Sequence, residues 1–393
     1  MKDREIRSLI SKEERRAKGV VNLIASENIA SEDVRAAFAS EFGNKYAEGY
    51  PGRRYYGGNT MIDELERLAQ RRALSLFGLS PKSWSVNVQP YSGSPANLAA
   101  LLALVPLGGK IMGMRLDHGG HLTHGHAVSA TGKLWTQVPY GVSKDTERID
   151  FDELEWIAER EKPAVVIAGF TAYSRIVDWK RFRKVADKAG ALLLVDMSHI
   201  SGLVAGGVHP SPFRYADVVT TTTHKTLRGP RGAMVFSRID ARKLHERINR
   251  AIFPGLQGGP HMHTIAGIAV VLREASTPAF RRYARQVVAN ARALSEELAR
   301  RGWRVVSGGT ENHMFLLDTW MGGLGIGGKE ASDRLERAGI IVNMNTIPFD
   351  TRKPTDPSGI RLGTPYETTR GKREKDMREI AERIDRALRK KPC

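Results

Sequence analysis

Cysteine is almost absent from this chain of 393 residues. The single cysteine, Cys393, is the last residue, so a disulfide within the chain and a cysteine-based metal site are both excluded. This usage fits a reducing, cytoplasmic location. The sequence also lacks any apolar run of the roughly 18 residues that a membrane helix needs. Residues 1–19 carry charges of both signs and no apolar segment, so we expect no secretory signal and no membrane association.

Acidic residues are outnumbered, since 61 Lys and Arg against 43 Asp and Glu give a net charge of +18. Such an excess can attract nucleic acid or a polyanionic small substrate. We favour a surface that is simply rich in arginine, because the sequence contains no zinc finger, RNP motif or basic stretch interleaved with aromatics. Part of the excess lies in residues 370–391. There, apolar residues at helical spacing predict an amphipathic helix packed on the body: Met377, Ile380, Ile384 and Leu388.

Short apolar runs alternate with helical stretches through the middle of the chain, which is the pattern of an α/β domain. Turn residues bound these runs, and such runs suit a mostly parallel sheet that is buried on both faces. Strands are expected at 110–114, 164–169, 191–196, 217–221 and 232–236, with helices at 60–77, 151–160, 179–189 and 281–301. Thr60 and Asp63 read as a capping box for the first of these helices.

Three parts of the chain are expected. Residues 1–60 look like an arm that packs elsewhere, for example on a second subunit, and residues 61–278 form a large domain. Residues 279–393 supply a linking helix and a smaller C-terminal α/β domain, with strands at 303–307, 313–318 and 340–343.

Lys225 is the most informative residue. It follows a β-branched run in the segment VVTTTTHKTLRGPRG, residues 218–232, and precedes a Gly/Pro turn. A buried strand end lowers the pKa of a lysine toward the neutral amine that forms a Schiff base. The aldehyde most often held in such a pocket is pyridoxal phosphate (PLP), an electron sink. A lysine in an ordinary surface turn is the alternative, so the neighbouring motifs must decide.

Asp196 is one such neighbour, because it closes the run at 191–196 and can reach the same sheet edge as Lys225. A carboxylate there could pair with a protonated pyridine nitrogen, or could simply cap the turn before His199. Ser92, Gly93 and Ser94 precede a helix and offer either an ordinary cap or a phosphate site.

Three further segments carry candidate chemistry. Residues 117–126 hold four histidines at a spacing that fits no metal motif, so we expect one imidazole to stack on a planar ligand. Residues 44–58 hold four tyrosines and Glu48, which suit either an active-site wall or an Ω-loop. Arg361, in the string SGIRLGTP, could anchor a carboxylate bidentately.

Nine segments, in order, resemble the serine hydroxymethyltransferase family. Among them are LIASEN at 23–28, NVQPYSGSPAN at 87–97, TTTTHKTLRGPRG at 220–232 and SGIRLGTP at 358–365. The resemblance covers the chain from about residue 10 to its end. It implies a PLP-dependent enzyme of fold type I, which is aspartate aminotransferase-like. Such an enzyme has a large domain with a mostly parallel central sheet, a smaller C-terminal α/β domain, and active sites shared across a homodimer or tetramer.

The resemblance also implies roles for particular residues. Lys225 would be the Schiff-base lysine, and the other catalytic residues would be Glu48, His121, Tyr56 and His224. The cofactor-binding residues would be Lys225, Asp196, His199, Ser92, Gly93, Ser94, His121, Thr171, Thr222, Tyr46, Gly258 and Gly259. The amino-acid substrate would meet Ser26, Glu48, Tyr56, His199 and Arg361. Folate would meet Leu116, Gly120, Leu122, Tyr55, Phe253 and Asn345. Tyr46, Glu48, Tyr56, Gly258 and Gly259 would come from the partner chain.

The activity that the resemblance implies is reversible transfer of the serine hydroxymethyl group to tetrahydrofolate, giving glycine and 5,10-methylenetetrahydrofolate. Thr171 stands where the family usually has serine, and residues 343–345 read NMN in place of NKN. Two alternatives are a folate-independent aldolase acting on β-hydroxy or α-methyl amino acids, and a nucleic-acid-binding protein that keeps the enzyme fold.

Overall fold

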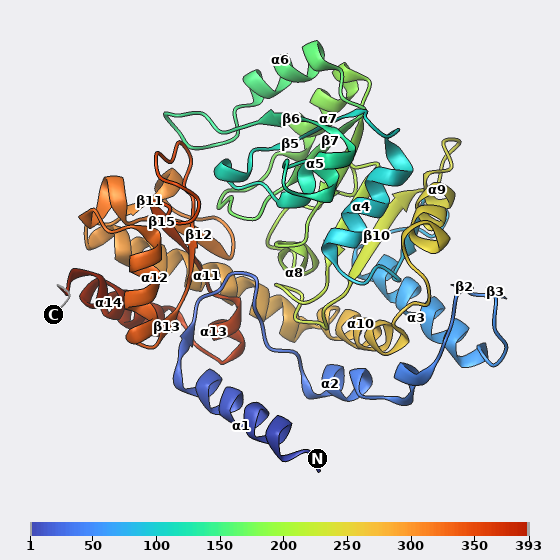
Figure 1. Ribbon diagram of the computed structural model, residues 1–393, viewed down its shortest axis with the longest axis horizontal. Helices are drawn as coiled ribbons and strands as arrows, with labels where there is room; N and C mark the ends of the chain where they lie inside the picture. Colours follow the sequence, from blue (N-terminus) through green and yellow to red (C-terminus); the bar gives the residue numbers. More distant parts are fainter. Residues whose placement is uncertain (1, 391–393) are drawn as a thin grey trace.

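A seven-stranded sheet lies at the centre of the large domain (Figure 1). The structure is a computed structural model that describes residues 2–390, so Cys393 lies outside the described residues. The strand order is β4-β10-β9-β8-β7-β5-β6. The strands are β4 (Trp84–Asn87), β5 (Lys110–Met114), β6 (Thr136–Tyr140), β7 (Val165–Gly169), β8 (Leu192–Asp196), β9 (Val218–Thr222) and β10 (Ala233–Arg238).

Strands β5, β7, β8 and β9 run parallel, as predicted, the unpredicted β6 is parallel to β5, and the helices between them make the crossovers. Strand β10 pairs antiparallel with both β9 and β4. Residues 223–232 join β9 to β10 without a helix, and only antiparallel neighbours can be linked by so short a connection. This connection carries His224 and Lys225.

The sheet edges were not predicted from the sequence. Strand β6 is an edge strand whose exposed and buried residues alternate and which contains Pro139, a residue tolerated in a sheet mainly at an edge. Strand β4 forms the other edge and has only four residues. Neither strand shows the continuous apolar run that marks a buried strand.

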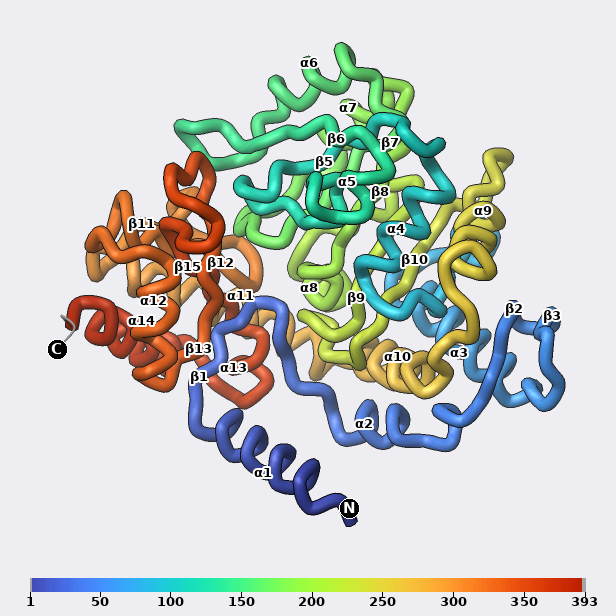
Figure 2. Tube along the Cα trace, in the orientation of Figure 1, coloured from blue at the N-terminus to red at the C-terminus, as the bar shows by residue number. Residues whose placement is uncertain are grey.

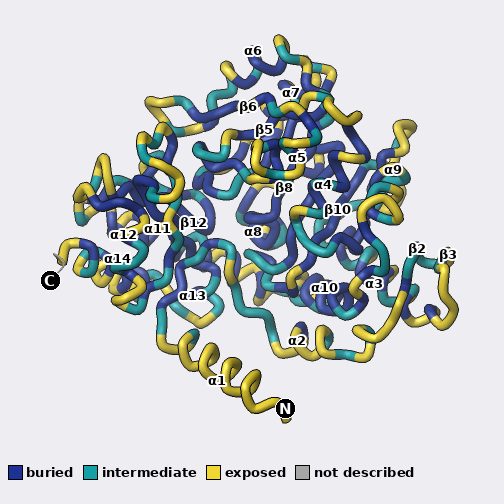
Figure 3. The backbone as a smooth tube through the Cα atoms, viewed as in Figure 1, coloured by how far each residue is buried: buried dark blue, intermediate teal, exposed yellow. Residues whose placement is uncertain are grey.

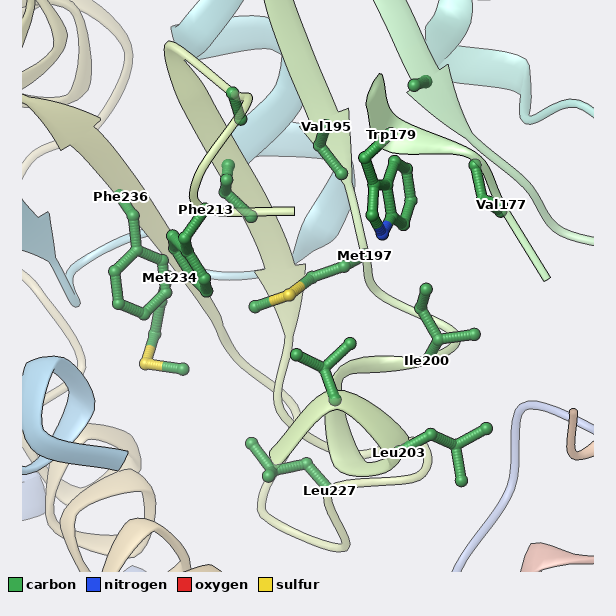
Figure 4. Close-up of a cluster of buried hydrophobic side chains, with 14 of the residues drawn as sticks. Val177, Trp179, Val195, Met197, Ile200, Leu203, Phe213, Leu227, Met234 and Phe236 are labelled. Carbon is green, nitrogen blue, oxygen red and sulfur yellow. The ribbon is translucent and has the colours of Figure 1, made fainter. Parts of the chain in front are cut away.

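Helices cover both faces of the sheet (Figure 1). They include α3 (Thr60–Leu76), α4 (Gly93–Leu104), α6 (Phe151–Glu161), α7 (Trp179–Ala189) and α10 (Met262–Ala275). Shorter elements are α5 (Ala130–Leu134), α8 (Ser201–Ala205), α9 (Leu244–Arg250), β2 (Gly49–Tyr50) and β3 (Arg53–Arg54). Figure 4 shows part of the core, where Trp179, Met197 and Phe213 lie among buried apolar side chains.

The predicted capping box of α3 is wrong. The N-cap is Asn59, not Thr60, and its side chain makes no capping bond to α3 within residues 2–390. Asp63 instead accepts hydrogen bonds from the Gly52 N–H at 2.6 Å and from Arg54 Nε at 2.9 Å. The carboxylate is used to hold the tyrosine-rich loop, which a local sequence pattern cannot reveal.

The C-terminal domain is built on an antiparallel sheet of order β11-β12-β15-β14. Its strands are β11 (Arg304–Val305), β12 (Met314–Asp318), β14 (Asn343–Asn345) and β15 (Gly359–Gly363). Strand β13 (Ile340–Ile341) directly precedes β14 in the chain but is not part of this sheet. Its helices are α11 (Pro278–Arg300), α12 (Gly328–Arg337), α13 (Pro365–Thr369) and α14 (Glu374–Arg389). The predicted apolar stripe of α14 is buried, as expected: Met377, Ile380, Ile384 and Leu388.

The first sixty residues divide into parts with different surroundings (Figure 2). Strand β1 (Val21–Asn22) pairs with β13, so it belongs to the C-terminal domain, whereas α2 (Glu32–Phe38) packs against α10 of the large domain. Helix α1 (Arg4–Gly19) has no buried residue and is exposed along its length (Figure 3). Within residues 2–390, no helix is both long enough and apolar enough to cross a membrane.

Candidate active site

A cavity of about 340 Å³ opens at the carboxyl ends of β7, β8 and β9. This edge of a parallel sheet is where α/β proteins bind ligands. The cavity brings together twelve residues that the sequence singled out: Ser26, Ser92, Gly93, Ser94, His121, Thr171, Asp196, His199, Thr222, His224, Lys225 and Arg361. They come from segments more than 300 residues apart in the chain, which only the tertiary fold unites.

Lys225 lies in the loop between β9 and β10, on the wall of this cavity. Burial lowers the pKa of its amine to about 8, the nearby Asp196 carboxylate opposes that shift, and Arg361 and Arg231 add to it. A substantial fraction of the amine is therefore neutral near neutral pH, as covalent capture of an aldehyde requires.

Asp196 ends β8 and carries the negative charge at the cavity floor. Its Oδ1 accepts bonds from the N–H and hydroxyl of Ser198 at 3.0 and 2.5 Å, and its Oδ2 accepts from Asn97 Nδ2 at 2.8 Å. His124 Nε2 lies 3.1 Å from the same Oδ2. Burial alone would raise the pKa of this carboxyl, but the bond from His124, the other nearby imidazoles and Ser198 lower it, so the carboxylate stays ionised.

Helix α4 begins at the opposite side of the cavity. Its N-cap, Ser92, makes no side-chain capping bond to the helix within the described residues, and Gly93 and Ser94 form its first turn. The free N–H groups at the start of a helix form a natural phosphate site. A side chain at Gly93 would place its Cβ 2.7 Å from Thr222 Cγ2, so glycine keeps this end of the cavity open.

Arg361 is buried on β15 and projects into the cavity from the C-terminal domain. Its Nε donates to Asn343 Oδ1 at 3.1 Å and its Nη1 donates to the Thr171 carbonyl at 2.9 Å. Burial lowers its pKa to about 10, so the guanidinium remains charged at physiological pH. A fixed, charged fork of this kind suits a substrate carboxylate.

The four histidines of residues 117–126 have separate surroundings. His121 lines the cavity and its Nδ1 lies 2.7 Å from the Thr123 hydroxyl; burial lowers the pKa of His121 to about 4, so its ring is neutral. His124 bonds to Asp196, and His118 Nδ1 accepts the Val142 N–H. No group of three potential metal ligands occurs in the described part of the chain, residues 2–390.

A second cluster of predicted site residues lies outside this cavity. Tyr56 donates its hydroxyl to Glu48 Oε2 at 3.2 Å, and the Glu48 charge raises the pKa of Tyr56. The ring of Tyr46 packs edge-on against Tyr56 at 5.2 Å. The same cluster includes Gly258, which faces Glu48, and Gly259, which faces the Tyr46 ring. None of these five residues lines the cavity of its own chain.

The six residues predicted to contact folate lie in different parts of the structure. Tyr55 packs edge-on against Phe253 with ring centroids 5.7 Å apart, next to the second cluster. Leu122 is exposed, Leu116 is half-buried, and Asn345 lies on β14, two residues from Asn343. At Gly120, a Cβ would lie 2.1 Å from the Met114 carbonyl oxygen, so close backbone packing already requires glycine there.

Sequence reasoning missed a polar network in the wall of the cavity, centred on Asn97. Asn97 Nδ2 donates to Asp196 Oδ2 and to Thr123 Oγ1, while its Oδ1 accepts the Thr220 hydroxyl at 2.6 Å. Asn97 links the segment of His121 to Asp196 and to β9. An asparagine on an otherwise apolar helix, in SPANLAALLAL, was the available signal.

The residues present fit PLP. The N-terminus of α4 can take the phosphate, Asp196 a pyridinium nitrogen and Lys225 the aldehyde. Thr171 lines the cavity, and its buried hydroxyl oxygen has no hydrogen-bond partner within residues 2–390. This hydroxyl is therefore available to bond with a polar ligand. Fold and site together define the class of PLP-dependent enzymes of fold type I.

Comparisons with known proteins narrow that class. The family profile described as serine hydroxymethyltransferase matches residues 1–384, and the chain belongs to this family. A serine hydroxymethyltransferase of Acidothermus cellulolyticus is 55% identical over 383 residues, covering 98% of this chain and 88% of the relative. Those of Koribacter versatilis and Alkalilimnicola ehrlichii are 52% and 53% identical, covering 98% and 96% of this chain and 89% of each relative.

Proposed function

We propose that this chain transfers the hydroxymethyl group of serine reversibly to tetrahydrofolate, giving glycine and 5,10-methylenetetrahydrofolate, with PLP as cofactor. The observation that carries the proposal is the meeting of Lys225, Asp196 and Arg361 in one cavity of a chain that belongs to the serine hydroxymethyltransferase family. Each of the three would meet a different need: an amine for the cofactor aldehyde, an anion for its ring nitrogen and a cation for the carboxylate of the amino acid.

PLP, when bound, withdraws electrons from the bond to the substrate Cα that breaks. Lys225 supplies the amine that holds the cofactor, and its lowered pKa keeps that amine reactive. Asp196 stays charged and favours a protonated ring nitrogen. His121 is neutral and lies on the cavity wall, where a flat ring could lie against it.

Arg361 orients the substrate. Its two bonds, to Asn343 and to the Thr171 backbone, fix the guanidinium before the substrate arrives. A carboxylate held by this fork places Cα and its substituents in one orientation, so that a chosen bond is aligned for cleavage. Ser26 lines the same cavity and offers a hydroxyl to the substrate.

The second cluster completes the site in a homodimer. On their own chain, the paired rings of Tyr46 and Tyr56 are 59% and 47% exposed, and Glu48 is half-buried beside them. Helix α1 adds an exposed apolar stripe of Ile6, Leu9 and Ile10. We assign both surfaces to a second copy of the chain, so that Glu48 of one chain exchanges a proton with the substrate hydroxymethyl group in the cavity of the other. Gly258 and Gly259 would face the phosphate in the same way.

Folate is assigned to the rim between the two chains. Tyr55 and Phe253 would supply aromatic surface for its ring system, Leu116, Gly120 and Leu122 would supply further contacts, and Asn345 would supply a polar contact. The single cysteine in the sequence favours a reducing cytoplasmic compartment for this chemistry.

The test is serine cleavage by the purified PLP-loaded protein with and without tetrahydrofolate. Formation of glycine and 5,10-methylenetetrahydrofolate together, with little cleavage in the absence of folate, is the expected result. Serine cleavage that is indifferent to folate would assign the chain to the folate-independent aldolases instead.

A further inference from the structure

Three buried histidines lie in series behind the active site, and only the first of them was expected to act there. His199 follows β8 and lines the cavity, His313 immediately precedes β12, and His209 follows α8. Their exposed fractions are 5%, 0% and 5%. His199 Nδ1 and His313 Nε2 are 3.2 Å apart, and the two rings are stacked. The large and small domains are thus joined by a contact between imidazoles.

The tautomer of His209 is fixed by its own surroundings. Its Nδ1 lies 3.1 Å from the Pro210 carbonyl oxygen, and a carbonyl can only accept, so Nδ1 carries the hydrogen. Burial lowers the pKa of His209 to about 4, which keeps the ring neutral. A neutral imidazole has one N–H, so His209 Nε2 is a bare acceptor.

A small cavity separates His209 from His313. It has a volume of about 10 Å³, which is room for one water molecule, and both rings line it. His209 Nε2 and His313 Nδ1 are buried and have no hydrogen-bond partner within residues 2–390. Trp179, Val177 and Ile200 form much of the apolar remainder of the wall (Figure 4).

Three side chains on that wall already use their donors elsewhere. The Arg175 guanidinium bonds to Ser307 and faces Glu311. Asn312 Nδ2 donates to the Tyr173 carbonyl at 2.9 Å, and Trp179 Nε1 donates to the Pro210 carbonyl at 2.9 Å. A water molecule between them can donate one hydrogen to His209 Nε2, which only accepts, and its second hydrogen to His313 Nδ1; buried water typically satisfies polar atoms in this way.

A water that donates to both nitrogens sets the hydrogen positions along the series. A water that donates to His313 Nδ1 makes that nitrogen bare, so the hydrogen of the neutral His313 ring is on Nε2. His313 Nε2 therefore donates to His199 Nδ1, and the hydrogen of His199 is on Nε2, the nitrogen left for the active-site cavity. Burial lowers the pKa of His313 to about 3. Burial, followed by the charges of Lys225 and Arg361, also lowers the pKa of His199. Both rings are therefore neutral.

We propose that His313, His209 and one buried water form a positioning relay that holds His199 as an N–H donor toward an oxygen of the bound cofactor. None of the three touches substrate except through His199. The inference rests on the proposed function for the identity of the cofactor, and on the ring geometry, the neutral rings and the bridging water for the hydrogen positions. The Pro210 carbonyl, which lies outside the active-site cavity, fixes the tautomer of His209. Through the relay, it thereby determines which nitrogen of His199 carries the hydrogen.

Two variants of His313 separate a positioning role from a structural one. His313→Gln keeps a donor near the place of Nε2, whereas His313→Leu removes it at similar volume. His245→Leu is the control, because His245 is part-buried on α9, distant in sequence, and lines neither cavity. Each protein is labelled with ¹⁵N-histidine, and the long-range ¹H–¹⁵N spectrum, which distinguishes the two neutral tautomers, is recorded before and after loading with PLP.

The wild type, H313Q and H245L are expected to show His199 with its hydrogen on Nε2 and His209 with its hydrogen on Nδ1. H313L is expected to show a mixed His199 tautomer and PLP dissociation faster by about tenfold, the effect of one hydrogen bond. A wild-type His199 with its hydrogen on Nδ1, or an unchanged His199 tautomer in H313L, would overturn the relay.

The wild-type spectrum decides the question even if H313L fails to fold. His209→Leu is the second variant, because it removes the far end of the relay without touching His199; it is expected to shift the His313 signals, and unchanged signals would count against the bridging water. The spectra are recorded without serine or folate, so they test the relay independently of the transferase activity. A failed folate assay would refute the proposed function and leave the tautomer assignments unchanged.

Discussion

Substitution of Arg361 by lysine tests how the site recognises an amino acid. Arg361→Lys keeps the charge at this position but removes the planar fork, because an ammonium group cannot bind a carboxylate bidentately. It also strips donors from Asn343 Oδ1 and the Thr171 carbonyl, which the guanidinium now satisfies at 3.1 and 2.9 Å. The orientation of the remaining cation is therefore lost, together with one of the two hydrogen bonds that the guanidinium would make to the substrate carboxylate.

The magnitude follows from one charge-assisted hydrogen bond. Such a bond contributes about 1.5–3 kcal/mol, so the dissociation constant for glycine should rise by about 10- to 150-fold. PLP content should be unchanged, since Arg361 is assigned to the substrate and not to the cofactor. The pKa of about 10 at Arg361 leaves the wild-type group charged throughout the assay range near neutral pH.

The assay is a titration of the PLP-loaded protein with glycine, followed through the visible absorption of the cofactor. Arg383→Lys is the matched control, because Arg383 is exposed on α14 and bonds only to the Ala338 carbonyl at 3.2 Å among the described residues. It should bind glycine as the wild type does. Glycine affinity within about twofold of the wild type in R361K would refute the assignment of the substrate carboxylate to this fork.

Three further predictions concern the cofactor and the second chain. Because burial lowers the pKa of Lys225 to about 8, the rate of PLP capture by the PLP-free protein should rise with pH and level off above about 8; a rise that continues toward pH 10 would indicate an ordinary exposed lysine. Asn97→Ala removes one bond to Asp196 and should weaken PLP binding by about tenfold in equilibrium dialysis, and unchanged affinity would show that the network does not support the ring. Unfolding and refolding an equal mixture of inactive Lys225→Gln and Glu48→Gln should recover about a quarter of wild-type activity, since half the dimers then carry one intact site, and no recovery would place Glu48 in the cavity of its own chain.

Much of the large domain could be predicted, because its central strands are continuous apolar runs. The strands predicted at 164–169 and 191–196 correspond to β7 and β8 within one residue, and the helix at 179–189 corresponds to α7. Buried parallel strands and amphipathic helices each impose a period on the sequence. The edges were missed because an edge strand such as β6 is half-exposed and needs no such run.

The site was predictable only in part, for a different reason. Lys225 and Asp196 stand at the ends of recognisable strands, so their convergence follows from the order of strands in the sheet. Asn97 and His124 line the cavity and Thr220 bonds to Asn97, and their roles depend on three segments meeting in space. His313 and His209 carry no local pattern at all, since the relation of His313 to His199 is set by the packing of one domain on the other and that of His209 by the chain after α8 folding back.

The central claim is that Lys225 holds the cofactor covalently. Borohydride makes the bond between PLP and its lysine permanent, so the freshly isolated yellow protein should be reduced, digested and mapped by mass spectrometry. The account predicts that the peptide containing Lys225 carries the added mass of the reduced cofactor. An unmodified Lys225 in fully reduced protein, or the cofactor attached to a different lysine, would contradict it.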